Sequence, residues 1–278
     1  METKNNKTID TIKKTTTNFF ALIGRPVIHL FTEMGKISNM TLSMFKWIFR
    51  KPFDFNSLLD QCVKVGYESL PVALITALAT GSILALQTGL TLEMYFQGLS
   101  QYVPTIVVLA FVRELGPVLT GIIIAGRVGS AMAAEIGTMK VTEQVEALET
   151  LGTNPIHYLV VPRFLAMVIM MPIIVLFADY VGIIGGGIVC KTQLGLSWST
   201  FWVNTVNSFT MGDVYSGLIK TFFFGGFIAI IGCYRGLQTS GGAEGVGKAT
   251  TDAVVIGAIT VLIADYFLSM LLNYTLHI

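Results

Sequence analysis

Long apolar runs separated by short polar segments dominate this chain. A helix needs about 20 predominantly apolar residues to cross a bilayer, and five runs reach that length. They are Leu70–Leu90, Val103–Ala125, Val160–Ile184, Val214–Tyr234 and Ala253–Leu272. The glycine-rich continuation of the third run, residues 182–190, would add a sixth element if it re-entered the membrane. The pattern predicts an all-α integral membrane protein with about five transmembrane helices.

Two further stretches predict helices outside these spans. Between residues 19 and 50, apolar side chains recur at three- and four-residue steps, with basic residues interspersed and Pro26 as an interruption. This is typical of an amphipathic helix lying in the cytoplasmic leaflet, although a helix that merely packs on the bundle would show the same pattern. Residues 191–213 are too polar to cross but rich in Trp and Phe, which favours an interfacial or short extramembrane helix.

The composition agrees with lipid as the surrounding solvent. Of the 278 residues, 53% are hydrophobic and only 13% are charged, against about a quarter charged in soluble domains. The net charge of +1 gives no indication of a nucleic-acid partner, and none is expected. Cys62, Cys190 and Cys233 lie too far apart to suggest a metal motif or a disulfide framework, so no metal site is expected. The polar N-terminus lacks the apolar core of a signal peptide.

Lys and Arg in the connecting segments predict the orientation in the membrane. Most of them fall in three segments: the N-terminal region up to Lys64, the loop after the second span and the loop after the fourth. Lys191 alone lies on the other side. We therefore expect a cytoplasmic N-terminus and, with five spans, a periplasmic C-terminus. The chain divides into a polar tail (1–18), an amphipathic interfacial region (19–69) and a membrane domain (70–278).

The segment Gly242–Ala249, GAEGVGKA, nearly matches a phosphate-binding loop. The Gly-x-x-x-x-Gly-Lys spacing is present, but Ala249 stands where a Ser or Thr hydroxyl would bind Mg²⁺. Such a loop also needs a buried strand before it, whereas here the preceding residues resemble the end of a span. We therefore expect a flexible cytoplasmic connector, and no ATPase activity in this chain.

Two ionisable residues, Arg113 and Glu114, fall near the middle of the second span. Each such charge costs about 2.5–3.5 kcal/mol on insertion scales, and neighbours in sequence point about 100° apart on a helix, so they serve each other poorly as partners. Gly116 and Pro117 follow directly and are predicted to break the helix, which can free backbone groups where a cavity is lined. A substrate cavity or gate and a purely structural ionic lock explain the pair equally well.

Three more charges lie inside the predicted spans. Arg113 could pair with Asp179 or Asp265, and Glu114 with Lys220; for the two aspartates we favour a structural role. In the third span, Gly182 and Gly186 form a Gly-x-x-x-Gly pair that permits close helix approach. That pair fits dimerisation and internal packing equally.

The segment between spans two and three contains a predicted cytoplasmic helix. Apolar positions from Val141 to Leu148 form one stripe and glutamates lie toward another, Thr142 can cap the second half, and the helix ends near Gly152. Such a helix could dock into a groove on a partner. The alternative is a solvated connector whose apolar side lies on the membrane surface.

Two long motifs now carry a family resemblance. The segment Arg113–Arg163, RELGPVLTGIIIAGRVGSAMAAEIGTMKVTEQVEALETLGTNPIHYLVVPR, closely resembles the signature of the MlaE (YrbE) family of ABC-transporter permeases. The segment Gly232–Val255, GCYRGLQTSGGAEGVGKATTDAVV, resembles that family's second marked loop. The likeness runs from about residue 60 to the C-terminus and makes 70–278 an MlaE-type permease domain.

The resemblance implies a permease that moves phospholipid between the bacterial inner membrane and the outer envelope. It implies a homodimer with separate cytoplasmic ATPase subunits, which bind ATP and Mg²⁺, and a periplasmic MCE-domain lipid-binding protein; no cofactor is expected on this chain. It implies that segment Ala131–Gly152 is the coupling helix. The implied lipid cavity is lined by Leu84, Leu92, Tyr95, Arg113 and Glu114. The implied contacts of the coupling helix with the ATPase are Glu135, Lys140, Glu143, Glu146 and Leu148.

A secondary transporter coupled to ions is the rival hypothesis. In that case Glu114, Asp179 and Asp265 would relay protons across the membrane. Such folds usually contain inverted repeats, and no convincing repeat relates the two halves of this chain. A structural membrane scaffold is a third class, and it would tolerate neutralisation of Arg113 and Glu114.

Overall fold

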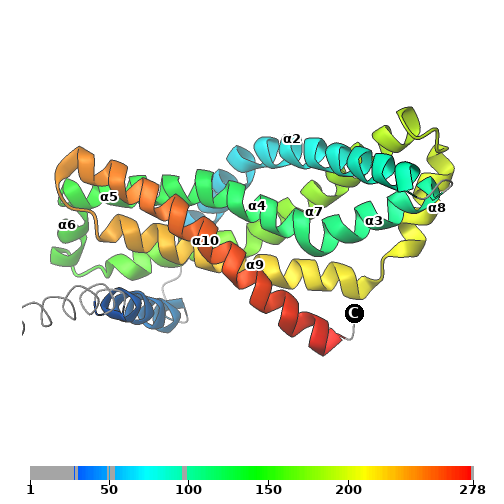
Figure 1. Ribbon diagram of the computed structural model, residues 1–278. Coiled ribbons are helices and arrows are strands. Elements are labelled where there is room, and N and C mark those ends of the chain that lie inside the picture. The colour runs from blue at the N-terminus through cyan, green and yellow to red at the C-terminus, as the bar shows by residue number, and fades with distance from the viewer. Residues whose placement is uncertain (1–27, 29–30, 49, 51–53, 96–98, 277–278) are drawn as a thin grey trace, which may run out of the picture.

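The computed structural model describes residues 28, 31–48, 50, 54–95 and 99–276, and within these ranges the chain is helical without strands (Figure 1). Five helices are long and apolar enough to cross a membrane. They are Phe55–Tyr95, Ser100–Val141, Ile156–Thr192, Met211–Leu237 and Gly242–Thr275. The predicted all-α class and the count of five are therefore confirmed.

The second and third spans are built from several helical segments joined end to end. The first, fourth and fifth spans are single helices, α2 (Phe55–Tyr95), α9 (Met211–Leu237) and α10 (Gly242–Leu276). The second consists of η1 (Ser100–Tyr102), α3 (Val103–Ala110), the π-helical turn η2 (Phe111–Leu115), α4 (Gly116–Ile124), the π-helical turn η3 (Ala125–Gly129) and α5 (Ser130–Val141). The third joins the π-helical turn η4 (Ile156–Val160) to α7 (Val161–Thr192), and the short helices α6 (Gln144–Thr150) and α8 (Trp198–Ser208) connect spans.

Several boundaries differ from the sequence pattern. Helix α2 begins at Phe55, well before Leu70, because the Asp54 side chain accepts hydrogen bonds from the backbone N–H groups of Asn56 and Ser57 (3.1 and 3.2 Å). The last part of the predicted interfacial region is thus continuous with the first span. The glycine-rich residues 182–190 continue α7 without a break, so they form no sixth element. Helix α8 is the short helix predicted between the third and fourth spans.

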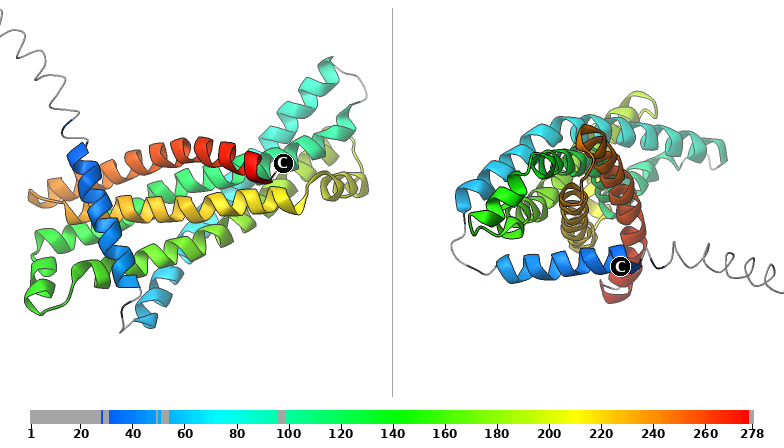
Figure 2. Two further views of the ribbon diagram at one scale, coloured as in Figure 1. Left: turned by 90° about the horizontal axis from the view of Figure 1, so that it is seen from below. Right: turned by 90° about the vertical axis from the view of Figure 1, so that its left-hand side faces the viewer.

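The spans form one bundle whose two ends differ. Helix α2 packs along α7, α7 packs on α9, and α9 also contacts α5 and α10. Helix α6, the turn between α9 and α10, and the N-terminal helix lie at one end of the bundle, and α8 lies at the other (Figures 1 and 2). The segments that carry most of the described Lys and Arg residues therefore share one end.

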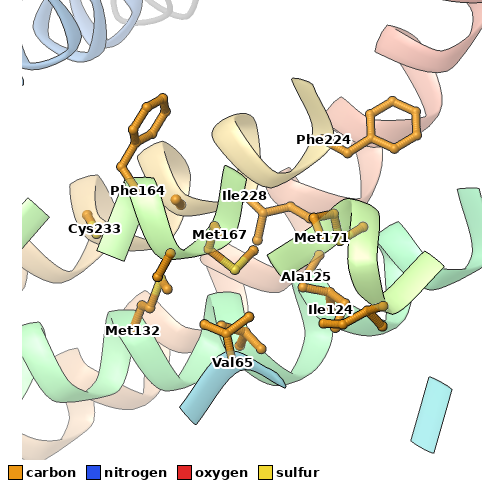
Figure 3. Close-up of a cluster of buried hydrophobic side chains, with 14 of the residues drawn as sticks. Val65, Ile124, Ala125, Met132, Phe164, Met167, Met171, Phe224, Ile228 and Cys233 are labelled. Carbon is orange, nitrogen blue, oxygen red and sulfur yellow. The ribbon is translucent and has the colours of Figure 1, made fainter. Parts of the chain in front are cut away.

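The core lies between the second, third and fourth spans. Met167 and Met171 of α7 lie between Ile124 of α4 and Ile228 of α9, all of them buried (Figure 3). Unbranched Met side chains fill the irregular space between helices that cross at different angles.

Glycine permits the closest helix contacts in the bundle. A Cβ atom on Gly81 of α2 would lie 1.9 Å from the carbonyl oxygen of Gly182 in α7, and one on Gly185 would lie 2.4 Å from the carbonyl oxygen of Leu78. Gly186 is in turn close to Val107 of α3. Within the described structure, the Gly182/Gly186 pair therefore serves internal packing.

The N-terminal helix, residues 31–48, packs across the end of the bundle (Figure 2). The Tyr234 hydroxyl of α9 donates a hydrogen bond to Glu33 (2.9 Å), and the rings of Trp47 and His157 lie 5.2 Å apart. The hydrogen bond from Lys36 and, to a smaller extent, the one from Tyr234 lower the pKa of Glu33. Phe31 and other apolar residues remain exposed on its other side, so the helix packs on the bundle and also presents an apolar face. The predicted part before residue 28, including Pro26, lies outside the described residues.

We expect Gly81→Ala to destabilise the protein, because the added methyl group meets backbone rather than a movable side chain. Overpacking of this kind costs about 1–3 kcal/mol. Thermal unfolding of the purified protein in detergent measures the effect. Gly247→Ala in α10 is the matched control, since a Cβ there has no atom within 4 Å. Equal melting temperatures for the two variants would contradict the proposed close contact.

Candidate functional site

Arg113 and Asp213 form an ion pair within the apolar bundle. The Arg113 Nε donates to Asp213 Oδ1, and Nη2 of the same guanidinium lies within ion-pair distance. Asp213 occupies the first turn of α9, where its Oδ2 accepts from the backbone N–H of Thr210 (2.6 Å) and from the Thr210 hydroxyl (2.9 Å). These contacts complete a capping box. The Asp213 side chain is only 2% exposed, whereas that of Arg113 is 34% exposed.

Lys220 is the centre of a second group of polar contacts. Its ammonium donates to Glu114 Oε2 (2.8 Å), lies 3.2 Å from Asp265 Oδ1, and is 1% exposed. The Ser269 hydroxyl of α10 donates to Glu114 as well. The group therefore ties the second, fourth and fifth spans together.

Pro117 explains the third contact of Lys220. A proline has no N–H, so the carbonyl four residues earlier, that of Arg113, loses its usual helical donor. The Lys220 ammonium donates to this carbonyl oxygen at 2.9 Å. The helix is not interrupted at Gly116 and Pro117 as expected; it widens into the π-helical turn η2 just before them. Such turns occur frequently at functional sites.

The sequence-based pairing was right for one charge and wrong for the other. Glu114 pairs with Lys220 as predicted. Arg113 contacts neither Asp179 nor Asp265, because Asp213 reaches it from the first turn of α9. Asp213 lies one residue before the predicted fourth span and was therefore missed. Its spacing of seven residues from Lys220 places both on one face of α9, and this pattern could have revealed it.

Gly217 lies between these two residues on the same face of α9. A Cβ there would be 2.3 Å from the carbonyl oxygen of Val112. The close approach of α9 to η2 brings Asp213 and Lys220 to the two charged residues of the second span.

The two other intramembrane aspartates differ from each other. Asp265 belongs to the Lys220 group, which agrees with a structural role. Asp179 of α7 is buried, and its Oδ1 has no hydrogen-bond partner in the described part of the chain. That oxygen lies against Gly116, where a Cβ would be 1.6 Å away. Asp179 thus packs against the segment that carries Arg113, and no cation among the described residues pairs with it.

The residues expected to line a lipid cavity divide into two groups. Leu84 and Leu92 of α2 are partly buried against the clusters that include Val107 and Phe111, on the side of the second span that faces α2 and α7. Tyr95 is exposed at the end of α2. Arg113 and Glu114 face α9 and α10 instead. Within one chain the two groups do not meet.

The predicted coupling helix consists of two helices. Helix α5 ends at Val141, and α6 begins at Gln144 after Glu143, which adopts a left-handed conformation (φ 60°). Thr142 does not cap the second half as predicted, since its hydroxyl donates back to the carbonyl of Thr138 (2.8 Å). The second helix ends near Gly152, as predicted.

Some of the residues expected to contact an ATPase are already engaged in ion pairs within the chain, and others are accessible. Lys140 and Glu146 pair with each other between α5 and α6, and this hydrogen bond lowers the pKa of Glu146. Glu135 bridges Lys64 of α2 and Arg163 of α7 at 2.9 Å each. Glu143 is exposed and Leu148 half-buried on α6. Glu135 thus holds the bundle together, while α6 offers the accessible surface.

The near-match to a phosphate-binding loop is mostly helical. Helix α10 begins at Gly242, after a turn in which Gly241 and Gly242 have positive φ angles (88° and 71°). The expected flexible connector is therefore limited to this turn. The element before it is helix α9 rather than a strand, so the geometry of a nucleotide-binding loop is not built here.

Fold and site together define a multi-pass helical membrane protein with ionised residues inside its spans. Comparison with known proteins identifies its family. A family profile described as "Permease MlaE" matches residues 58–271, and the chain belongs to this MlaE permease family. It is thus a permease subunit of an ABC transporter, with a role in transport.

Three relatives illustrate the similarity. A probable ABC transporter permease protein of Rickettsia bellii is 43% identical over 254 residues, which cover 90% of this chain and 95% of the relative. A probable ABC transporter permease protein of Synechocystis is 43% identical over 234 residues, covering 84% and 88%. The Arabidopsis thaliana protein TRIGALACTOSYLDIACYLGLYCEROL 1, chloroplastic, is 37% identical over 222 residues, covering 80% and 63%.

We expect Lys220→Met to destabilise the protein by about 1–3 kcal/mol, because it leaves the mostly buried Asp265 and the partly exposed Glu114 without their cation. Adding Glu114→Gln and Asp265→Asn should restore part of the loss, since the stranded charges are then removed as well. Thermal unfolding in detergent measures both effects, with Lys248→Met on exposed α10 surface as control. A triple variant less stable than Lys220→Met would contradict this account.

Proposed function

We propose that this chain moves phospholipid between the inner membrane and the outer envelope of a bacterium. In this proposal it acts as a homodimer, with cytoplasmic ATPase subunits that supply the energy and a periplasmic MCE-domain protein that exchanges lipid. The observation that carries the proposal is the exposure of Arg113 and Glu114, whose side chains are 34% and 45% accessible within the second membrane-spanning helix.

Partly exposed charges at this depth require a polar or protein environment. Hydrocarbon around them would cost about 2.5–3.5 kcal/mol per charge, so the exposed parts are best covered by a second copy of the chain or by a hydrated cavity. A cavity between two copies satisfies both conditions. It would also unite Arg113 and Glu114 of one copy with apolar surface such as Leu84, Leu92 and Tyr95 from the other.

The chemistry of Arg113, Glu114 and the apolar helices around them suits a phospholipid. A guanidinium forms strong, two-pronged hydrogen bonds with phosphate, and the surrounding apolar helices suit acyl chains. The Arabidopsis relative is named for a diacylglycerol glycolipid, which supports a cargo built on diacylglycerol. Glu114, held by Lys220 and Ser269, limits the positive charge that the cavity presents.

The two ends of the bundle support the proposed orientation. The N-terminal helix, α6 and the α9–α10 turn lie at the end rich in Lys and Arg, which we assign to the cytoplasm. Leu151, directly after α6, is 80% exposed there. An exposed apolar side chain at the end of a short helix, at the end of the bundle that we assign to the cytoplasm, suits docking into a groove of the ATPase. The C-terminus is then periplasmic.

We expect Arg113→Ala to reduce co-purified phospholipid about tenfold, the order expected for loss of one charge-assisted contact. Lipid phosphorus per mole of protein, measured on the purified complex, checks this. Arg113→Lys retains the charge and should lose less. The amount of co-purified ATPase should stay constant, which separates lipid loss from disassembly. Wild-type lipid content in Arg113→Ala would count against the assignment.

We expect Leu151→Glu to abolish co-purification of the ATPase while lipid content is retained, because a carboxylate cannot enter an apolar groove without a large desolvation cost. Pull-down through this chain measures the ratio of the subunits. Leu99→Glu, at a partly exposed position directly before η1, at the end of the second span remote from α6, is the control. Transport that depends on a proton gradient and needs no nucleotide would favour the rival, ion-coupled mechanism.

A further inference from the structure

The proposed lipid site leaves the contact between Arg113 and Asp213 unexplained. Arg113, the cation proposed to bind lipid phosphate, is already occupied by a carboxylate of the same chain. We propose that Asp213 is a built-in competitor of the lipid phosphodiester for Arg113 and thereby sets how tightly, and with what headgroup preference, lipid is held. This inference rests on the proposed function and adds a specificity-determining residue to it.

Asp213 is fixed independently of Arg113. Its Oδ2 is held by both donors of Thr210, in a capping box that anchors the first turn of α9. The positive end of the helix dipole adds further stabilisation to a carboxylate at this position. Asp213 can therefore stay buried as an anion after Arg113 has left.

The Arg113 side chain, in contrast to that of Asp213, is partly exposed and free to rotate. Arg113 exposes about one-third of its side chain, and its polar side-chain contact within the described part of the chain is the ion pair with Asp213. Its backbone is held in place, because Lys220 binds its carbonyl oxygen. The guanidinium can thus exchange partners by side-chain rotation alone, without a change in the helix.

The exchange replaces one anionic partner of the Arg113 guanidinium with another. When the guanidinium turns to a phosphodiester, one monoanionic partner of Arg113 replaces another. The site gains the charge of the phosphodiester, and the Asp213 carboxylate, left without its cation, keeps two hydrogen bonds and the favourable helix terminus. Bound lipid must therefore displace Asp213 on every cycle. An ion pair that is re-formed on release also keeps Arg113 from holding lipid permanently.

The experiment compares wild type with Asp213→Asn, which has nearly the same shape without the charge. Complexes purified through this chain are loaded with vesicles containing equal amounts of phosphatidylethanolamine and phosphatidylglycerol, and bound lipid is counted by native mass spectrometry. We expect Asp213→Asn to retain about threefold more lipid, the order expected when a partly exposed ion pair no longer competes. The gain should be larger for the anionic phosphatidylglycerol.

A second pair of variants keeps the capping box intact. Glu and Gln both complete a capping box at this position, so Asp213→Glu and Asp213→Gln differ from each other only in charge. Asp213→Gln should retain more lipid than Asp213→Glu, even if Asp213→Asn assembles poorly. Asp252→Asn, which removes a carboxylate beside Arg235 at the other end of α9, is the control and should match wild type.

The outcomes separate the two hypotheses. If wild type holds phospholipid and neither Asp213→Asn nor Asp213→Gln holds more than its charged counterpart, Asp213 is only structural and this inference is wrong, while the proposed function stands. If wild type and all variants hold no phospholipid, the proposed function is wrong, and the inference that rests on it is wrong as well. Displacement of the retained lipid by inorganic phosphate alone would show a general anion site and would also overturn the inference.

Discussion

One buried ammonium group holds the charged interior of this protein together. Lys220 is 1% exposed and contacts a carboxylate of the second span, a carboxylate of the fifth span and a backbone carbonyl that Pro117 has left without its helical donor. An isolated charge in this position would be prohibitively costly. It is tolerated because three acceptors converge on it, and those acceptors in turn fix where three spans lie relative to one another.

Small residues make this convergence possible. Gly217 lets α9 approach the carbonyl of Val112, and Gly116 leaves room for the side chain of Asp179. Without these contacts the spans would lie farther apart, and the side chains of Asp213 and Lys220 would not reach the second span. The contact at Gly217 and the ion pairs of Asp213 and Lys220 therefore depend on the same close approach of α9 to the second span.

The sequence predicted those parts of the structure that depend on composition along one helix. Five apolar runs, the short helix before α9 and the pairing of Glu114 with Lys220 all follow from hydropathy, aromatic content and the cost of unpaired charge. The failures concern geometry between helices. The partner of Arg113 was sought inside the spans, whereas Asp213 comes from the first turn of α9, where capping decides its position. Likewise, the break between α5 and α6 depends on the left-handed backbone conformation of Glu143, which the periodicity of apolar residues does not predict.

Helix α9 connects the charged group with the opposite end of the bundle. Near its start it carries Asp213 and Lys220, and near its end Tyr234 binds Glu33 of the N-terminal helix. Between these points its glycines contact neighbouring backbone: a Cβ on Gly225 would lie 2.6 Å from the carbonyl oxygen of Met167. Phe224 and Ile228 of α9 are buried in the core as well, so the helix is held along its length and moves only as a rigid unit. Any displacement of α9 along its axis therefore changes the separation of Asp213 from Arg113, and the ion pair reports on contacts made at the far end of the same helix.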